Sequence, residues 1–186
     1  MKIILGALVG VMVLAGIYYW TTYNTLISLN EGVDAQWAQV ESQYQRRFDL
    51  IPNLVESVKG IMAQEKEIFL GIAEARTRYS GAGNANDKAA AATEMEGALG
   101  RLLVVMENYP QLKSSENVQT LMVQLEGTEN RISVERMRFN DLVKGFNVAI
   151  KQIPAKWIAS SLGYSERNYF EAVEGAETAP AVNFKN

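Results

Sequence analysis

The chain has 186 residues, a formal net charge of −3 at pH 7, and neither cysteine nor histidine. At this length one domain with its own core is expected. The missing cysteine and histidine exclude disulfides, thiolate nucleophiles and the commonest zinc ligands, and with them most hydrolase mechanisms. The mild acidic charge argues against a nucleic-acid surface and against a polybasic lipid-binding patch. We expect no cofactor, no metal and no catalytic residue.

Residues 3–20, IILGALVGVMVLAGIYYW, form an unbroken apolar and aromatic run, here called the apolar segment. It is about long enough to cross the hydrocarbon core of a bilayer as a helix. A cleaved signal peptide is the alternative, but bulky residues directly follow the small residues of its LAG sequence at 14–16. We predict an uncleaved single-pass anchor over residues 1–23, with its aromatic cluster at the membrane surface.

The basic residues beside the apolar segment predict its orientation. Lys2 precedes it, whereas Glu31 and Asp34 come before the first basic residue on the other side, Arg46. The positive-inside bias therefore places the amino terminus in the cytoplasm and the body outside the cytoplasmic (inner) membrane.

From Val33 to Tyr79, apolar residues recur at spacings of three and four, which predicts one long helix. Pro52 should kink it. The glycines and asparagines of SGAGNAND, residues 80–87, predict a turn, and Asn86 or Asp87 could cap a second helix that ends near Asn108.

The sequence YPQLKSS, residues 109–115, predicts the next break. Beyond it, a heptad pattern from Val118 to Ile153 predicts a third helix that Pro154 closes. A short helix through Trp157 follows, and after Gly163 we expect an extended tail. The predicted fold is all-α: an antiparallel up-and-down bundle of long helices, four-helix type, over residues 24–163. The tail, residues 164–186, should pack on this bundle through Phe170, Val182 and Phe184.

The segment YQRRFDLIPNLV, residues 44–55, carries polar residues on the face opposite its apolar seam. Arg46, Asp49 and Asn53 form this polar row. It is either a solvated face or a docking surface. In the second case the candidate partner surface joins the row to the membrane-proximal seam: Trp37, Val40, Tyr44, Arg46, Asp49 and Asn53.

Helix lengths support an uncovered seam. At ~1.5 Å per residue, the first predicted helix would measure about 70 Å and the second about 33 Å. The third helix and the tail, with Trp157, should cover most of the remainder, which leaves Trp37, Val40 and Tyr44 for a partner or a second copy of the chain.

Two charged residues, Glu129 and Arg136, occupy core positions of the heptad pattern. A paired-carboxylate metal site would usually also need histidine, so a buried polar network that fixes helix register is the preferred interpretation. Arg76 is the expected partner of Glu129. The candidate network comprises Arg76, Glu129, Ser133, Arg136, Asn140 and Asn147.

Four phrases, in order, resemble the LemA family of bacterial membrane proteins: YQRRFDLIPNLV, YPQLK, TENRISVERMRFN and YFEAVEGAETAPAVNF. The resemblance implies an amino-terminal transmembrane helix and a helical bundle, and no settled biochemical activity. It also implies an association with membrane metalloproteases and the opposite orientation, with the amino terminus outside.

We therefore expect a non-enzymatic, membrane-anchored scaffold or adaptor that binds another protein through a long helical rod. The association with metalloproteases that the resemblance implies points to a role in membrane-protein quality control. The alternative is a membrane-associated enzyme or its accessory subunit, with a Ser–Lys or Glu–Arg pair in a pocket.

Overall fold

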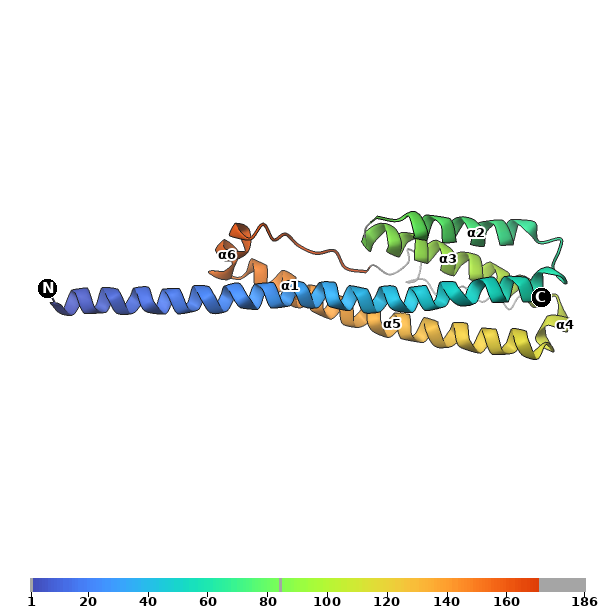
Figure 1. The fold of residues 1–186 in the computed structure, drawn as a ribbon, viewed down its shortest axis with the longest axis horizontal. Coiled ribbons are helices and arrows are strands. Elements are labelled where there is room, and N and C mark those ends of the chain that lie inside the picture. Colours follow the sequence, from blue (N-terminus) through green and yellow to red (C-terminus); the bar gives the residue numbers. More distant parts are fainter. Residues whose placement is uncertain (1, 84, 171–186) are drawn as a thin grey trace, which may run out of the picture. The chain divides into compact units, whose positions relative to one another are not determined.

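The computed structural model describes residues 2–83 and 85–170, apart from the side chain of residue 86, and this part of the chain contains helices and no strand. Figure 1 shows the helices α1 (Lys2–Lys59), α2 (Lys66–Gly81), α3 (Ala85–Met106), α4 (Pro110–Lys113), α5 (Glu116–Lys151) and α6 (Ala155–Ser161). The predicted all-α fold is confirmed.

Helix α1 contains the apolar segment and continues without a break into the body. Within the described residues it is the one helix long and apolar enough to cross a membrane, and the side chains of its apolar stretch are all exposed. This agrees with a membrane-associated chain that has a single spanning helix. The domain boundaries at residues 23 and 163 stay predictions.

The predicted helix from Val33 to Tyr79 is wrong, because the chain turns between α1 and α2. The amides of Ile61 and Met62 both donate to the Val58 carbonyl, at 3.0 and 2.9 Å, and α1 ends there. The apolar spacing hid this turn, since Met62 is fully buried within it and Ile72 and Tyr79 are buried again on α2. The estimate of one 70 Å helix with an uncovered apolar seam is therefore wrong as well.

The contacts divide the chain into two compact units. Among the described residues, the first comprises 2–43 and 131–169, and the second comprises 44–130 and Phe170. Helices α1 and α5 contribute to both.

In the second unit, α2 and α3 lie side by side (Figure 1). Aromatic rings join α2 to α1: the Tyr79 ring centroid lies 4.1 Å from that of Phe48 and 6.0 Å from that of Tyr44. Near the turn after α1, the Tyr109 hydroxyl donates to Glu65 at 3.0 Å. This hydrogen bond, with smaller contributions from burial and from the Glu65 charge, raises the pKa of Tyr109.

In the first unit, α5 packs along α1. The Trp37 and Phe139 rings meet edge to face with centroids 5.8 Å apart, and the Gln36 amide donates to the Glu135 carboxylate at 2.6 Å. Asn147 on α5 is buried and holds the segment after α6, because it both donates to the Arg167 carbonyl (2.9 Å) and accepts from the Arg167 amide (2.8 Å).

The later helix ends follow the sequence signals. The break at YPQLKSS is confirmed, although Pro110 begins the short α4 rather than ending a helix. Helix α3 begins at Ala85, slightly before the expected cap, and α5 ends before Pro154. Gly163, with a φ of 71°, follows α6, and there the Tyr164 amide donates to the Ala159 carbonyl and the Gly163 amide to that of Ser160. These two bonds form a Schellman motif, in which glycine suits the left-handed position.

Beyond α6, residues 164–170 are not helical, as expected after Gly163. Two of the three predicted anchors of the tail, Val182 and Phe184, lie outside the described residues, so the packing of the tail stays a prediction. Trp157, which was expected to help cover the seam, instead leaves 67% of its surface exposed.

Candidate functional site

A buried arginine, Arg47, stands at the centre of the charged residues of the second unit. Its side chain is 11% exposed and contacts two carboxylates from different helices: Glu129 on α5, in a direct ion pair, and Glu96 on α3 at 3.6 Å. A cation between two acids offsets their mutual repulsion and the cost of their desolvation. Arg47 therefore ties α1, α3 and α5 together.

The predicted inward position of Glu129 is only partly realised, since its side chain is 43% exposed. Its predicted partner is wrong: Arg47 lies beside it, whereas Arg76 is exposed on α2. A signal for Arg47 was present, because it follows the buried Tyr44 by three residues and precedes the buried Ile51 by four. That spacing places it on the apolar face of α1.

The other residues of the predicted polar network differ in burial. Asn147 is buried against Arg167, while Arg136 and Asn140 are half-buried. Ser133 is exposed, so the predicted network is not buried along its whole length. A further polar residue that the sequence did not single out, Thr128, is buried and donates to the Leu125 carbonyl at 2.7 Å.

The predicted partner surface separates into a buried half and an exposed half. Val40 and Tyr44 are buried within the chain, with 0% and 1% of their surfaces exposed, and Trp37 is half-buried against Phe139. Val40 and Tyr44 were therefore wrongly assigned to a partner, because α5 and α2 supply the neighbours that the single-rod prediction lacked.

The polar row itself is exposed along its whole length, at Arg46, Asp49 and Asn53. Its contacts are local: the Gln45 amide donates to the Asp49 carboxylate at 2.9 Å, and the Ser57 hydroxyl donates to the Asn53 backbone carbonyl at 2.7 Å. The row faces away from the buried positions of α1 and presents a cation, an anion and an amide in succession.

Apolar side chains are also exposed beside α3 and α5 in the second unit. A shallow groove there is lined by Leu103 on α3 and by Met122 and Val123 on α5, and Val123 is 68% exposed. The polar end of the groove is formed by Arg47 and Glu129. In the part of the chain that the structure describes, no three acidic side chains are grouped so as to hold a metal ion.

The chain is similar to known bacterial proteins. It is 26% identical over 182 residues to "Magnetosome protein MamQ 2" and to "Magnetosome protein MamQ 1" of Paramagnetospirillum magneticum, with 84% of this chain and 67% of each relative covered. The "Magnetosome protein MamQ" of Magnetospirillum gryphiswaldense matches with the same identity and coverage.

The family comparison includes both the polar row and the Arg47 cluster, which consists of Arg47, Glu96 and Glu129. The model of the LemA family matches residues 36–184, which contain α1 from Gln36 onward and every later helix. The chain belongs to the LemA family.

Proposed function

We propose that this LemA-family chain is a membrane-anchored adaptor without enzymatic activity, which binds another protein through its helical body. The observation that carries the proposal is the exposed polar row on α1, the helix that also contains the apolar segment. A helix of this kind offers an anchor and a recognition surface in one element.

The chemistry of the polar row defines the partner surface that would fit it. Arg46 favours a carboxylate opposite it, Asp49 favours a cation or an amide donor, and Asn53 can both donate and accept. Electrostatic complementarity of this type gives specificity and orientation to an interface more than raw affinity. The matching partner is a protein that carries an acidic and a basic group about one helical turn apart.

The competing interpretation is that the polar row is only solvated. In that case Arg46 and Asp49 together stabilise the chain by well under ~1 kcal/mol and bind nothing. The two interpretations differ in what replacing the charges does in the membrane, since a solvated face tolerates charge reversal and an interface does not.

Photo-cross-linking in membranes tests the adaptor function. A photoreactive residue at Asn53, which is exposed at the carboxyl end of the polar row, should give a defined intermolecular product. The double charge reversal Arg46→Glu with Asp49→Lys should reduce that product several-fold, because it opposes both expected contacts.

Two control positions fix the interpretation of this experiment. The same photoreactive residue at Gln124, which is exposed on α5, controls for random collision. At Phe139, which is buried, the photoreactive residue should give intramolecular products alone. If the Asn53 product is no stronger than the Gln124 product, or survives charge reversal unchanged, the polar row is a solvated face and the proposal fails.

A further inference from the structure

Residues 152–162, which follow the end of α5 in the first unit and are here called the tip, expose apolar side chains although α6 also contributes to the core. On α6, Ala155, Ile158 and Ala159 are buried against the rest of the unit. On the outer side, Ile153 is 72% and Trp157 67% exposed. One face of the tip is thus used for folding, and the other is apolar and uncovered.

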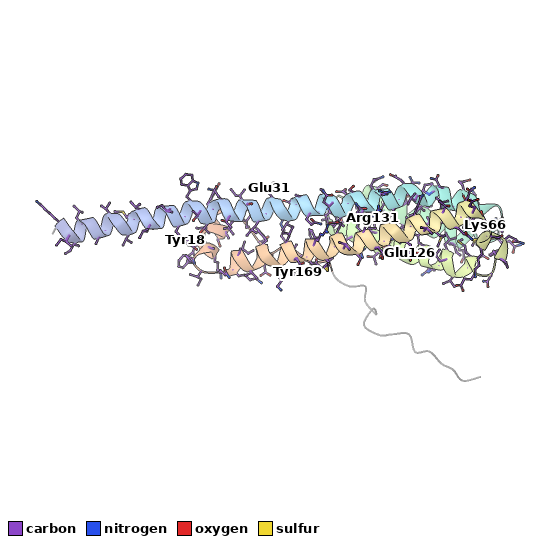
Figure 2. All side chains as sticks on the ribbon, turned by 90° about the horizontal axis from the view of Figure 1, so that it is seen from below. Tyr18, Glu31, Lys66, Glu126, Arg131 and Tyr169 are labelled. Atoms are coloured by element: carbon purple, nitrogen blue, oxygen red, sulfur yellow. The ribbon has the colours of Figure 1, made fainter. Side chains whose placement is uncertain are left out.

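The position of α6 indicates what covers this outer face. Figure 1 shows α6 beside α1, and Figure 2 shows it next to Tyr18. A shallow apolar pocket lies between the two helices, lined by Ala15, Tyr18 and Tyr19 of α1 and by Trp157, Ile158 and Ser161 of α6. The α1 residues of this pocket belong to the apolar segment.

The depth of this contact follows from helix geometry. Ala15 lies five residues before Trp20, the end of the apolar segment, which corresponds to about 8 Å along a helix. If residues 3–20 cross the bilayer, a helix packed against residues 15–19 must lie inside the boundary of the same leaflet. Helices that lie in a membrane interface are buried by about 5–10 Å, so the depths agree.

We propose that residues 152–162 form a second membrane contact, in which α6 lies at the bilayer interface with Ile153 and Trp157 in contact with lipid. The inference rests on the anchor of the proposed function and adds a lipid-binding site to it. The ligand is the boundary between headgroups and acyl chains in the leaflet next to the body.

The composition of the tip suits this location. Residues 152–162, QIPAKWIASSL, contain no acidic residue and a single cation, Lys156. Tryptophan is enriched at membrane interfaces, and a lysine there can extend its ammonium group to the lipid phosphates while its methylene stem stays in apolar surroundings.

Several polar groups of the tip are satisfied within the chain. The Ser161 hydroxyl donates to the Ile158 carbonyl at 2.7 Å, and the Lys156 and Trp157 amides donate to the Gln152 and Pro154 carbonyls at 2.7 and 3.1 Å. The Schellman motif after α6 satisfies the carbonyls at its other end. Internal satisfaction of this kind is needed where water is scarce.

Site-directed spin labelling of the full-length protein in phospholipid nanodiscs tests the contact. Since the chain has no cysteine, a single cysteine can be introduced as Trp157→Cys, as Ile153→Cys or, for comparison, as Val9→Cys and Val148→Cys. Val9 lies in the apolar segment, and Val148 is exposed on α5 in the same unit. Collisions of each label with oxygen, which enters lipid, are compared with collisions with a water-soluble nickel complex.

The measured quantity is the ratio of a label's collision rate with oxygen to its collision rate with the nickel complex. We expect this ratio to be several-fold higher for labels at 153 and 157 than for the label at 148, and to approach the ratio for the label at 9. Unchanged helical content and thermal unfolding of each variant verify the fold, and Ile153→Cys keeps Trp157 in place. If labels at 153 and 157 behave like that at 148, the inference is overturned. A nickel-accessible label at 9 would overturn the anchor as well, whereas the adaptor function fails separately, in the cross-linking at Asn53.

A second copy of the chain is the other occupant that the experiment can detect. Spin–spin broadening at 157 that disappears on dilution with unlabelled protein would show that protein, rather than lipid, covers the outer face of α6. That result would also overturn the inference.

Discussion

Two adjacent arginines, Arg46 and Arg47, carry the same charge but differ in burial because of their positions around the helix. They are about 100° apart on α1, so Arg46 is exposed in the polar row while Arg47 is buried between Glu96 and Glu129. A residue's role here depends on its angle on the helix and not on its chemistry. The pair therefore supplies an internal comparison between a structural and a surface arginine.

Replacement of Arg47 by alanine should destabilise the protein by about 2–4 kcal/mol, because it leaves Glu96 and Glu129 close together without their cation. Glu129→Ala should cost less, about 1–2 kcal/mol, since Glu129 is partly exposed and Arg47 keeps Glu96. Thermal unfolding of the purified protein in mild detergent measures both values.

The neighbouring variant Arg46→Ala is the matched control, and we expect it to change the free energy of unfolding by less than about 0.5 kcal/mol. Equal effects of the two arginine variants would show that the Arg47 cluster does not stabilise the fold.

Among the elements, α1 tolerates a proline in its interior. The helix continues through Pro52 to Lys59, although proline cannot donate to the carbonyl four residues before it, that of Phe48. Interior proline generally costs a helix about 3 kcal/mol relative to alanine. In α1 the packing of Phe48, Ile51 and Leu54 against the rest of the chain must offset this cost.

Pro52→Ala should therefore stabilise the protein by about 1–3 kcal/mol, because it restores the missing hydrogen bond while the buried neighbours keep their contacts. The unfolding temperature of the purified chain should rise. Asn53→Ala, at the adjacent exposed position, is the control and should have a much smaller effect. A lower unfolding temperature for Pro52→Ala would mean that the fold depends on a proline-induced bend.

The sequence predicted these elements to different degrees. Apolar spacing identified the helices, and Pro154 and Gly163 marked the ends of α5 and α6, because both residues act locally. The turn at residues 60–65 was missed, since Gly60 was its main local signal and Met62 kept the apolar pattern in phase. A hydrophobic pattern reports that a residue is buried, but it does not report which helix covers it.

The candidate site shows the same limit. The polar row was placed correctly on an exposed face because that depends on α1 alone. The partner of Glu129 and the burial of Val40 and Tyr44 depend on distant segments, so they required the fold. The exposure of Trp157 was also beyond a sequence argument, because an apolar residue on a short helix can face either the core or a membrane.

At the scale of the whole molecule, orientation in the membrane decides which partners can meet the polar row. Lys2 is the basic residue beside the amino end of the apolar segment, and no lysine or arginine follows the segment before Arg46. The charge bias therefore favours a body outside the cytoplasm, whereas the resemblance to the family implied the opposite.

We expect added protease to degrade the body in spheroplasts of a bacterium that expresses the chain. The variant Lys2→Glu combined with Thr22→Lys moves the positive charge across the apolar segment, and it should protect a substantial fraction of the molecules by inverting them. Full protection of the unaltered chain until lysis would reverse the assignment and place the polar row in the cytoplasm.

The pairing of α1 with α5 also determines the order in which the molecule can be completed during synthesis. Gln36 can form its hydrogen bond only after Glu135, which is 99 residues later, has been synthesised. Asn30 likewise needs Arg167, which is 137 residues later. At about 5–20 residues per second, the ribosome needs roughly 5–30 s to supply these partners. Throughout that interval a nascent α1, already inserted through its apolar segment, leaves Val33 and Val40 without their final cover. The membrane surface and any holding chaperone then compete for the face that α5 will later occupy.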